Sequence, residues 1–183
     1  MKTLLLSLTL ALTLFAAAAM AQTPTDPENT LYLDLKDGRV VIQMRPDLAP
    51  KHVARIKELV RQGFYNGLTF HRVIEGFMAQ GGDPDGTGAG GTGTKIPAEF
   101  SSEPFERGVV GMARSSDPDS GDSQFYIMFA NGSFLNGNYT VWGKVISGMQ
   151  FVDSITRGEP PANPDKIIKM QVAADTMTEA AAE

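Results

Sequence analysis

Residues 69–83 carry several side chains that could do chemistry. The stretch reads TFHRVIEGFMAQGGD and holds an imidazole, a guanidinium, two large apolar side chains and an amide: His71, Arg72, Phe77, Met78 and Gln80. A segment that only filled a core would not carry this set. A Glu-Gly pair interrupts the apolar pattern, which indicates two strands joined by a tight turn. Adjacent strand residues point to opposite faces, so His71 and Arg72 would face different sides, with part of each strand lining a shared active-site surface.

The elements before this stretch are predicted from hydrophobic spacing. Alternation of leucine with polar residues over 31–35 indicates a half-buried strand, and residues 39–44 return as its hairpin partner. Apolar residues at helical spacing then predict a helix over residues 50–62. This helix is expected to cover a sheet.

The second half of the chain is predicted to be mostly strands. Residues 82–94 are too rich in glycine to pack a core and are expected to form a long loop. Further strands are expected at residues 108–114, 123–129, 139–146 and 166–173, and a short helix at 149–155. About eight strands and two helices, without βαβ alternation, favour a mainly β fold: a closed eight-stranded antiparallel barrel capped by two α-helices.

The ends of the chain are expected to lie outside this fold. Residues 1–21 have a positive start, an apolar run and an A-x-A pattern, and are predicted to be a secretory signal peptide. The apolar run is too short to span a bilayer with any margin. Residues 22–29 are predicted to be a flexible leader, residues 30–174 a single domain, and residues 175–183 a flexible tail.

Composition excludes several classes of function. The formal net charge is −5, with scattered basic residues, so the chain lacks the basic patch of a nucleic-acid-binding protein. There is no cysteine, which excludes thiol chemistry and thiolate metal sites. No metal, no cofactor and no stable membrane association after signal cleavage are expected. Because a closed barrel leaves few free strand edges, a monomer is expected.

Three local motifs indicate other chemistries. Residues 86–91 fit the dinucleotide-binding pattern G-x-G-x-x-G, but no helix is predicted after them. The Gly-Asp-Ser run at 121–123 could hold a serine nucleophile, but no triad can be assembled from spacing. Asp117, Asp119 and Asp122 could bind calcium, yet the ligand pattern of an EF-hand loop is absent. A turn entering a strand is the preferred interpretation of residues 121–123, and a solvated turn is preferred for the three aspartates.

Four short strings point to a known family when they are taken together and in order. They are HR at 71–72, FMAQGGD at 77–83, MA at 112–113 and SQF at 123–125. In this combination the chain resembles the cyclophilin family of peptidyl-prolyl cis/trans isomerases, over about residues 31–172. The resemblance implies an eight-stranded barrel capped by two helices, a site in a groove on its outer surface, and an enzyme of EC class 5.2.1.8.

The resemblance also implies roles for individual residues. Arg72 is the principal catalytic group, because its forked guanidinium can hydrogen-bond the substrate and favour the prolyl lone pair as conjugation is lost. Gln80 bonds the substrate carbonyl and orients Arg72, and His71 supports the polar side of the groove. The implied substrate-binding residues are Phe77, Met78, Ala113, Arg114, Gln124, Tyr126, Phe134, Leu135 and Tyr139, with Phe134 at the pocket rim and Ala113 and Arg114 pairing with the substrate chain.

The key side chains also have ordinary structural explanations. Phe77 and Met78 could be core residues, and Arg72 could form a surface ion pair with Glu75 or Asp83. Their occurrence in the order of the family favours function over these alternatives.

The sequence departs from the best-known eukaryotic cyclophilins at four positions. Tyr126 stands where they carry Phe, Phe134 where they carry Trp, Tyr139 where they carry a second His, and Arg114 where they carry Asn. A phenylalanine at position 134 resembles the bacterial branch of the family. In that branch cyclosporin binds weakly, because the indole N–H of the tryptophan is missing. Arg114 and Tyr139 leave the extended substrate preference open.

Two functions are compatible with this resemblance. In the first, the protein isomerises X-Pro bonds in proline-containing polypeptides while exported proteins fold, without a covalent intermediate. In the second, the groove binds proline segments as a chaperone without significant isomerase activity. The signal peptide and the absence of cysteine favour the bacterial periplasm as the location, and a eukaryotic secretory compartment is the alternative.

Overall fold

The computed structural model describes residues 26–180. The predicted signal peptide at residues 1–21 lies outside the described residues. The strands are β1 (Thr30–Leu35), β2 (Gly38–Met44), β3 (Phe70–Ile74), β4 (Met78–Gly81), β5 (Val109–Met112), β6 (Phe125–Met128), β7 (Val141–Ser147) and β8 (Lys169–Val172). The α-helices are α1 (Pro50–Arg61), α2 (Met149–Asp153) and α3 (Ala173–Ala180), and short 3-10 turns form η1 (Pro27–Asn29), η2 (Pro118–Ser120) and η3 (Ser133–Leu135).

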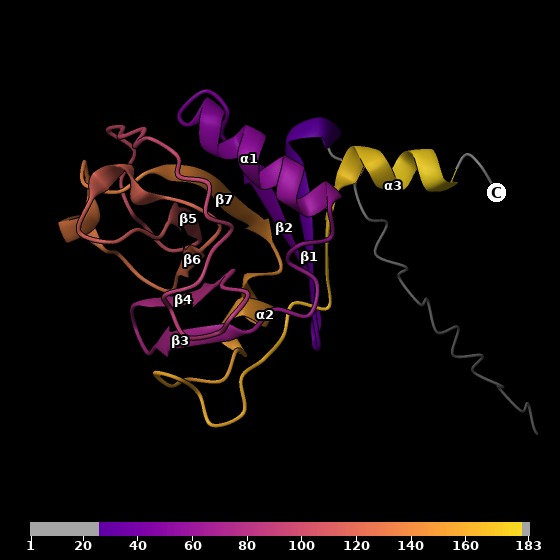
Figure 1. Ribbon diagram of the computed structural model, residues 1–183. Helices are drawn as coiled ribbons and strands as arrows, with labels where there is room; N and C mark the ends of the chain where they lie inside the picture. Colours follow the sequence, from indigo (N-terminus) through magenta and orange to yellow (C-terminus); the bar gives the residue numbers. More distant parts are fainter. Residues whose placement is uncertain (1–25, 181–183) are drawn as a thin grey trace, which may run out of the picture.

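The eight strands form one curled antiparallel sheet in the order β3-β4-β6-β5-β7-β2-β1-β8. Figure 1 shows the sheet curving around an interior, with α1 across the top of the view and the connection from α2 to β8 hanging below β3. Within residues 26–180, β3 and β8 do not pair as strands. The segments that precede β8 and lie around the start of β3 are joined by an isolated bridge between Thr69 and Lys166, and by backbone hydrogen bonds such as that from the amide of Ile167 to the carbonyl of Leu68 (2.8 Å). The predicted mainly β, eight-stranded architecture is confirmed, whereas full closure of the barrel is not.

Side-chain alternation divides the apolar residues between two clusters. Phe125 and Ile127 of β6 point into the main core. Tyr126, between them, points the opposite way, as the period of two requires. The outward-facing set forms an outer cluster made of Met78, Phe105, Val109, Tyr126, Met128, Leu135 and Val141. Strands β5 and β6 are therefore buried on both faces. The outer cluster forms a packed apolar layer on the outer face of the sheet.

Helix α1 starts at a carboxylate cap that comes from far along the chain. Glu99 accepts hydrogen bonds from the backbone amides of Lys51 (3.1 Å) and His52 (3.0 Å), two of the orphan donors of the first turn. The Nδ1 atom of His52 lies 2.7 Å from the same carboxylate, and the imidazole is buried. The apolar face of the helix, Val53, Ile56, Leu59 and Val60, packs into the main core.

Parts of the predicted leader and tail belong to helices. Residues 27–29, expected in a flexible leader, form η1, and residues 175–180, expected in a flexible tail, belong to helix α3. The guanidinium of Arg61 joins the two ends, because it bonds the carboxylates of both Glu28 (3.0 Å) and Asp175 (3.0 and 3.1 Å). The sequence predicted two α-helices, and residues 26–180 contain a third, α3, so that prediction is wrong by one. No helix in that range is long and apolar enough to cross a membrane.

Candidate active site

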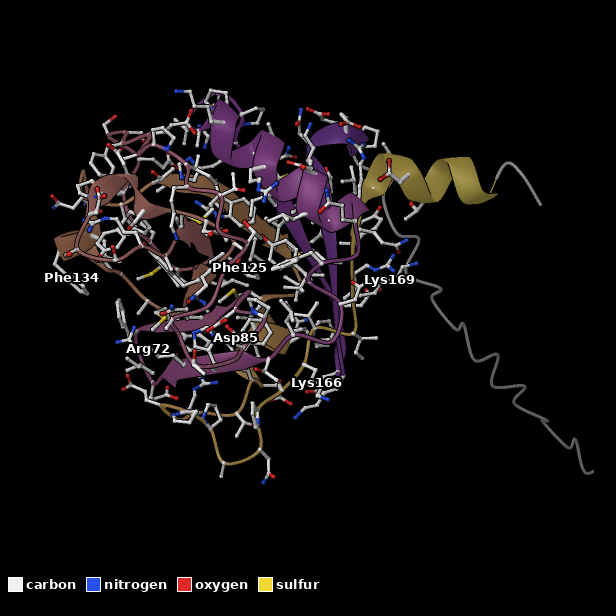
Figure 2. All side chains as sticks on the ribbon, viewed as in Figure 1. Arg72, Asp85, Phe125, Phe134, Lys166 and Lys169 are labelled. Carbon is white, nitrogen blue, oxygen red and sulfur yellow. The ribbon has the colours of Figure 1, made fainter. Side chains whose placement is uncertain are left out.

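A pocket of about 420 Å³ opens on the outer face of the sheet, above the outer cluster. Its walls come from β3, β4, β6, η3 and the segments that flank β5 and β7. Nine of the twelve residues implied by the sequence resemblance line it. They are Arg72, Phe77, Met78, Gln80, Ala113, Arg114, Tyr126, Leu135 and Tyr139. Figure 2 shows Arg72 and Phe134 on the same side of the molecule.

Three polar side chains form a chain of hydrogen bonds along one wall. Arg72 and Gln80 are cross-strand partners on β3 and β4, and Arg72 Nη1 donates to Gln80 Oε1 at 3.4 Å. Gln80 Nε2 in turn donates to Gln124 Oε1 at 2.9 Å. Gln124 Nε2 donates to the backbone carbonyls of Gly88 (3.0 Å) and Gly90 (2.8 Å). The orientation of Arg72 is therefore linked to the glycine-rich loop.

The pairing of Arg72 differs from the alternatives considered for it. Its Nε atom donates to Glu159 Oε2 at 2.9 Å, across 87 positions of sequence. Glu75 instead pairs with Arg157, and the Asp83 carboxylate is occupied by backbone amides. Sequence reasoning missed Glu159, and no local pattern could have identified it, because the contact depends on how the connection after α2 returns to β3.

The floor of the pocket is apolar and aromatic. The Tyr126 ring stacks on Phe105 with centroids 5.9 Å apart and meets Tyr139 edge-on at 6.1 Å. Burial raises the pKa of the Tyr126 hydroxyl, and that hydroxyl finds no hydrogen-bond partner within residues 26–180. With Met78 and Leu135 beside it, this floor has the character of a site for a small apolar ring.

Phe134 lies at the edge of the pocket rather than in its lining. Its side chain is 68% exposed, and its ring packs against Phe77 with centroids 5.4 Å apart. Both features agree with the rim position that the resemblance implies.

Arg114 carries a positive charge that no carboxylate within residues 26–180 pairs. Its guanidinium lies 4.3 Å above the ring of Tyr139 and donates to the carbonyls of Asn138 and Ser115. A cation–π contact of this kind fixes the plane of the guanidinium. Arg114 thus lies on the boundary between the pocket and a neighbouring depression in the surface.

That neighbouring surface is a second, larger depression of about 790 Å³. It shares Gln80, Ala113 and Arg114 with the pocket and includes Gln124, which the first pocket does not. Its other lining residues are Gly88, Ala89, Gly90, Lys95, Ser115, Ser120 and Asp122. The two depressions form a continuous groove that could hold several residues of an extended chain.

The glycine-rich loop that borders this groove is folded around two buried carboxylates. Asp83 accepts from the backbone amides of Asp85 (2.8 Å) and Thr87 (3.0 Å), and Asp122 accepts from those of Thr92 and Gly93 (both 2.9 Å). Burial opposes ionisation of both, but these bonds outweigh it and hold both pKa values below the usual range. The expectation that Asp122 belongs to a solvated turn is wrong, since its residue is only 6% exposed.

His71 lies under the groove and not in it. The residue is 5% exposed, and neither ring nitrogen has a hydrogen-bond partner of ordinary geometry within residues 26–180. Burial lowers the pKa of the imidazole, which the nearby Asp83 carboxylate only partly offsets. A neutral, enclosed imidazole supports the loop by packing. The described residues also contain no cluster of three or more His, Asp or Glu side chains that could hold a metal ion.

Comparisons with known proteins show what this chain is similar to. The family described as cyclophilin type peptidyl-prolyl cis-trans isomerase/CLD matches residues 30–172. A probable peptidyl-prolyl cis-trans isomerase of Brucella suis is 56% identical, with 87% of this chain and 90% of that protein covered. Peptidyl-prolyl cis-trans isomerase B of Bacillus subtilis is 44% identical, with 71% of this chain and 92% of that protein covered.

Two solved structures show the same fold. The cyclophilin AquaCyp293 of Hirschia baltica superposes with a TM-score of 0.76 at 32% identity, covering 82% of this chain and 76% of that one. A cyclophilin-type isomerase of Cryptosporidium parvum, solved in the presence of the dipeptide Ala-Pro, has a TM-score of 0.73 at 28% identity and covers 78% and 98%.

Proposed function

The chain belongs to the cyclophilin-type peptidyl-prolyl cis-trans isomerases, enzymes of EC class 5.2.1.8, and from this premise we propose how its own residues act. Arg72 stabilises the twisted state of an X-Pro bond whose proline ring occupies the pocket. Gln80 holds the substrate carbonyl and orients Arg72. The substrates are proline-containing polypeptides, bound as extended segments along the groove.

The reaction needs electrostatic help and no bond to the enzyme. Rotation about a peptide bond faces a barrier of about 18–20 kcal/mol because amide resonance is lost. In the twisted state the prolyl nitrogen becomes pyramidal and its lone pair can accept a hydrogen bond. A group that donates to this state more strongly than to either planar isomer lowers the barrier. The forked guanidinium of Arg72 offers several N–H donors for this purpose.

The observation that carries the proposal is the position of Arg72. Its guanidinium stands beside an apolar floor, with Nη1 engaged by Gln80 and Nε by Glu159. Within residues 26–180 no hydrogen bond uses Nη2, so that amino group is available to a substrate. This combination of an apolar seat for a ring and a fixed cation beside it matches what rotation of an X-Pro bond requires.

Binding of the substrate backbone would use the groove on the Ala113 side. The amide of Ala113 already donates to the carbonyl of Gln124 at 2.9 Å. The substrate would therefore bond to the carbonyl of Ala113 and to the backbone of Arg114, as an added strand does. Backbone pairing of this kind gives affinity with little demand on sequence.

The proposal is tested by a protease-coupled assay on an Ala-Pro peptide with the wild type and Arg72→Ala. Loss of one such donor should lower kcat/KM by roughly 100- to 1000-fold. A wild-type rate no faster than that of Arg72→Ala would refute the mechanism. Tight peptide binding without acceleration would instead support the proline-segment-binding chaperone.

We further propose that the protein acts on exported proteins in a bacterial periplasm. The support is the composition of residues 1–21, with a positive start, an apolar run and an A-x-A pattern. Expression in a bacterium followed by N-terminal sequencing should give a mature chain that begins at Gln22. A chain that retains Met1 in the cytoplasmic fraction would contradict this location.

A further inference from the structure

The side chain of Glu159 contacts the catalytic arginine from outside the pocket lining. Its Oε2 atom accepts from Arg72 Nε at 2.9 Å, and the residue belongs to the connection between α2 and β8. We propose that Glu159 is a positioning residue, which fixes the guanidinium of Arg72 in the orientation that the reaction needs. This inference rests on the function proposed for Arg72.

The backbone that carries Glu159 is anchored to the strand that carries Arg72. Gly158 and Val73 exchange two hydrogen bonds, of 2.8 and 2.9 Å, in an isolated β-bridge. Gly158 has a φ of 149°, and a Cβ placed there would lie 2.5 Å from Pro161 Cα, so only glycine fits without distortion. Because Glu159 follows Gly158 and Arg72 precedes Val73, the bridge sets the two side chains next to each other.

The farther end of the connection is also held. The backbone amide of Thr156 donates to Asp165 Oδ2 at 2.7 Å, and Lys36 pairs with the same aspartate. The amide of Phe70 donates to the carbonyl of Asp165 at 2.9 Å, which ties this part of the chain to β3 as well. Glu159 therefore sits in a braced segment and not in a free loop.

The ion pair between Arg72 and Glu159 contributes little to the stability of the fold, but it restricts the orientation of the Arg72 guanidinium. The side chains of Arg72 and Glu159 are 41% and 52% exposed, and exposed pairs of this kind add little to the stability of the fold. An arginine side chain has several rotatable bonds, and each has to be fixed before its donors can act on a transition state. Glu159 and Gln80 bind different nitrogens, so together they restrict the rotation and tilt of the guanidinium.

A second ion pair in the same region provides a matched control. Arg157 Nε donates to Glu75 Oε2 at 2.6 Å, which links the same connection to the turn between β3 and β4. Neither residue lines the pocket. Removing this pair tests whether loosening the connection in general is enough to change activity.

The experiment compares the full-length wild type with Glu159→Ala, Glu159→Gln and Glu75→Ala by steady-state kinetics on an Ala-Pro peptide. Glu159→Ala should lose about tenfold in kcat with KM nearly unchanged, because a displacement of 1 Å can cost up to a hundredfold. Glu159→Gln keeps an acceptor oxygen and should recover most of the rate. Glu75→Ala removes the control pair and should match the wild type, and all variants should keep its melting temperature.

Two results would overturn the inference. Glu159→Ala could turn over as fast as the wild type, or faster, in which case the carboxylate obstructs Arg72 or is irrelevant to it. Equal losses in Glu159→Ala and Glu75→Ala would mean that only the bracing of the connection matters.

A readout independent of activity separates this inference from the proposed function. Solvent exchange of the Arg72 Nε proton, followed by NMR, should be slow in the wild type and fast in Glu159→Ala. An inactive wild type with a protected Nε proton would refute the proposed function and leave the contact established. An unprotected proton in an active wild type would refute the positioning role alone.

Discussion

Arg72 and Gln80 face each other across β3 and β4, and Gln80 Nε2 donates a hydrogen bond to Gln124 Oε1 at 2.9 Å. The Arg72–Gln80 hydrogen bond is long at 3.4 Å, whereas the bonds of Gln124 to the carbonyls of Gly88 and Gly90 are of ordinary length. The polar wall of the pocket is therefore anchored most firmly at its loop end. At its catalytic end, Arg72 makes its shorter hydrogen bond to Glu159, at 2.9 Å.

Replacing Gln124 should disturb Arg72 although the two side chains do not touch. In Gln124→Ala, Gln80 loses its acceptor and the carbonyls of Gly88 and Gly90 lose their donor. We expect kcat/KM to fall about fivefold, which corresponds to one hydrogen bond of roughly 1 kcal/mol. Hydrogen exchange should also become faster in residues 84–94. The control is Gln150→Ala, an exposed position on α2, and equal kinetics in both variants would contradict the prediction.

Removing Asp83 should unfold the glycine-rich loop locally. The carboxylate accepts from several backbone amides, and charge-assisted bonds of this kind are strong. Asp83→Ala should lower the free energy of unfolding by about 2–4 kcal/mol. Because the loop carries the acceptors of Gln124, isomerase activity should fall as well. Asp85→Ala changes an exposed carboxylate two positions away and should leave both measurements unchanged.

Much of the fold follows from local patterns in the sequence. The alternation around Leu31 and Leu33 places β1 correctly, and the same period of two sends Tyr126 to the pocket and Phe125 to the core. Helix α3 was missed because it packs on η1 and β1 through contacts that no local pattern reveals.

The site was predicted less completely than the fold. The residues that line the pocket belong to short strings with a family signature. The sequence did not reveal the contacts of three acidic residues, Glu159, Asp83 and Asp122. They lie in connecting or glycine-rich segments, where an acidic residue usually indicates a solvated turn. Burial of a carboxylate within such a loop depends on which amides converge on it, and that is a property of the folded chain only.

Stability should fall as the pH is lowered below neutrality. Burial lowers the pKa of His52, against the opposing effect of Glu99. Burial opposes ionisation of Glu99 too, but its bonds to His52 and to the α1 amides outweigh this and lower its pKa. The unfolded chain therefore takes up protons that the folded chain excludes, first near pH 6.5 and then near pH 4.3.

Urea unfolding at pH 7, 6 and 5 measures this dependence. The midpoint should decrease at each step, and His52→Gln should flatten the change between pH 7 and pH 5. His71, whose pKa is also lowered by burial, preserves part of the slope in that variant. A wild-type midpoint that stays constant from pH 7 to pH 5 would contradict the assignment.

Phe134→Trp should strengthen the binding of cyclosporin. Phe134 is 68% exposed at the pocket rim, so a larger ring fits without disturbing the core. An indole N–H adds one donor, worth roughly 1 kcal/mol or about a fivefold decrease in Kd. Calorimetry on the wild type and the variant gives the comparison. Phe134→Tyr serves as a control for added size, and an equal gain there would show that the indole donor is not responsible.

The contacts of Arg61 with Glu28 and Asp175 indicate where the protein can be attached to a support. They hold Glu28 and Asp175 at one point. Lys169 lines the same depression as Arg61 and Asp175, and Figure 2 places Lys169 on the opposite side of the molecule from Arg72 and Phe134. A fused partner or a solid support attached close to Glu28 or Asp175 would therefore leave the groove facing solution. Immobilised protein should therefore turn over peptides as well as free protein does.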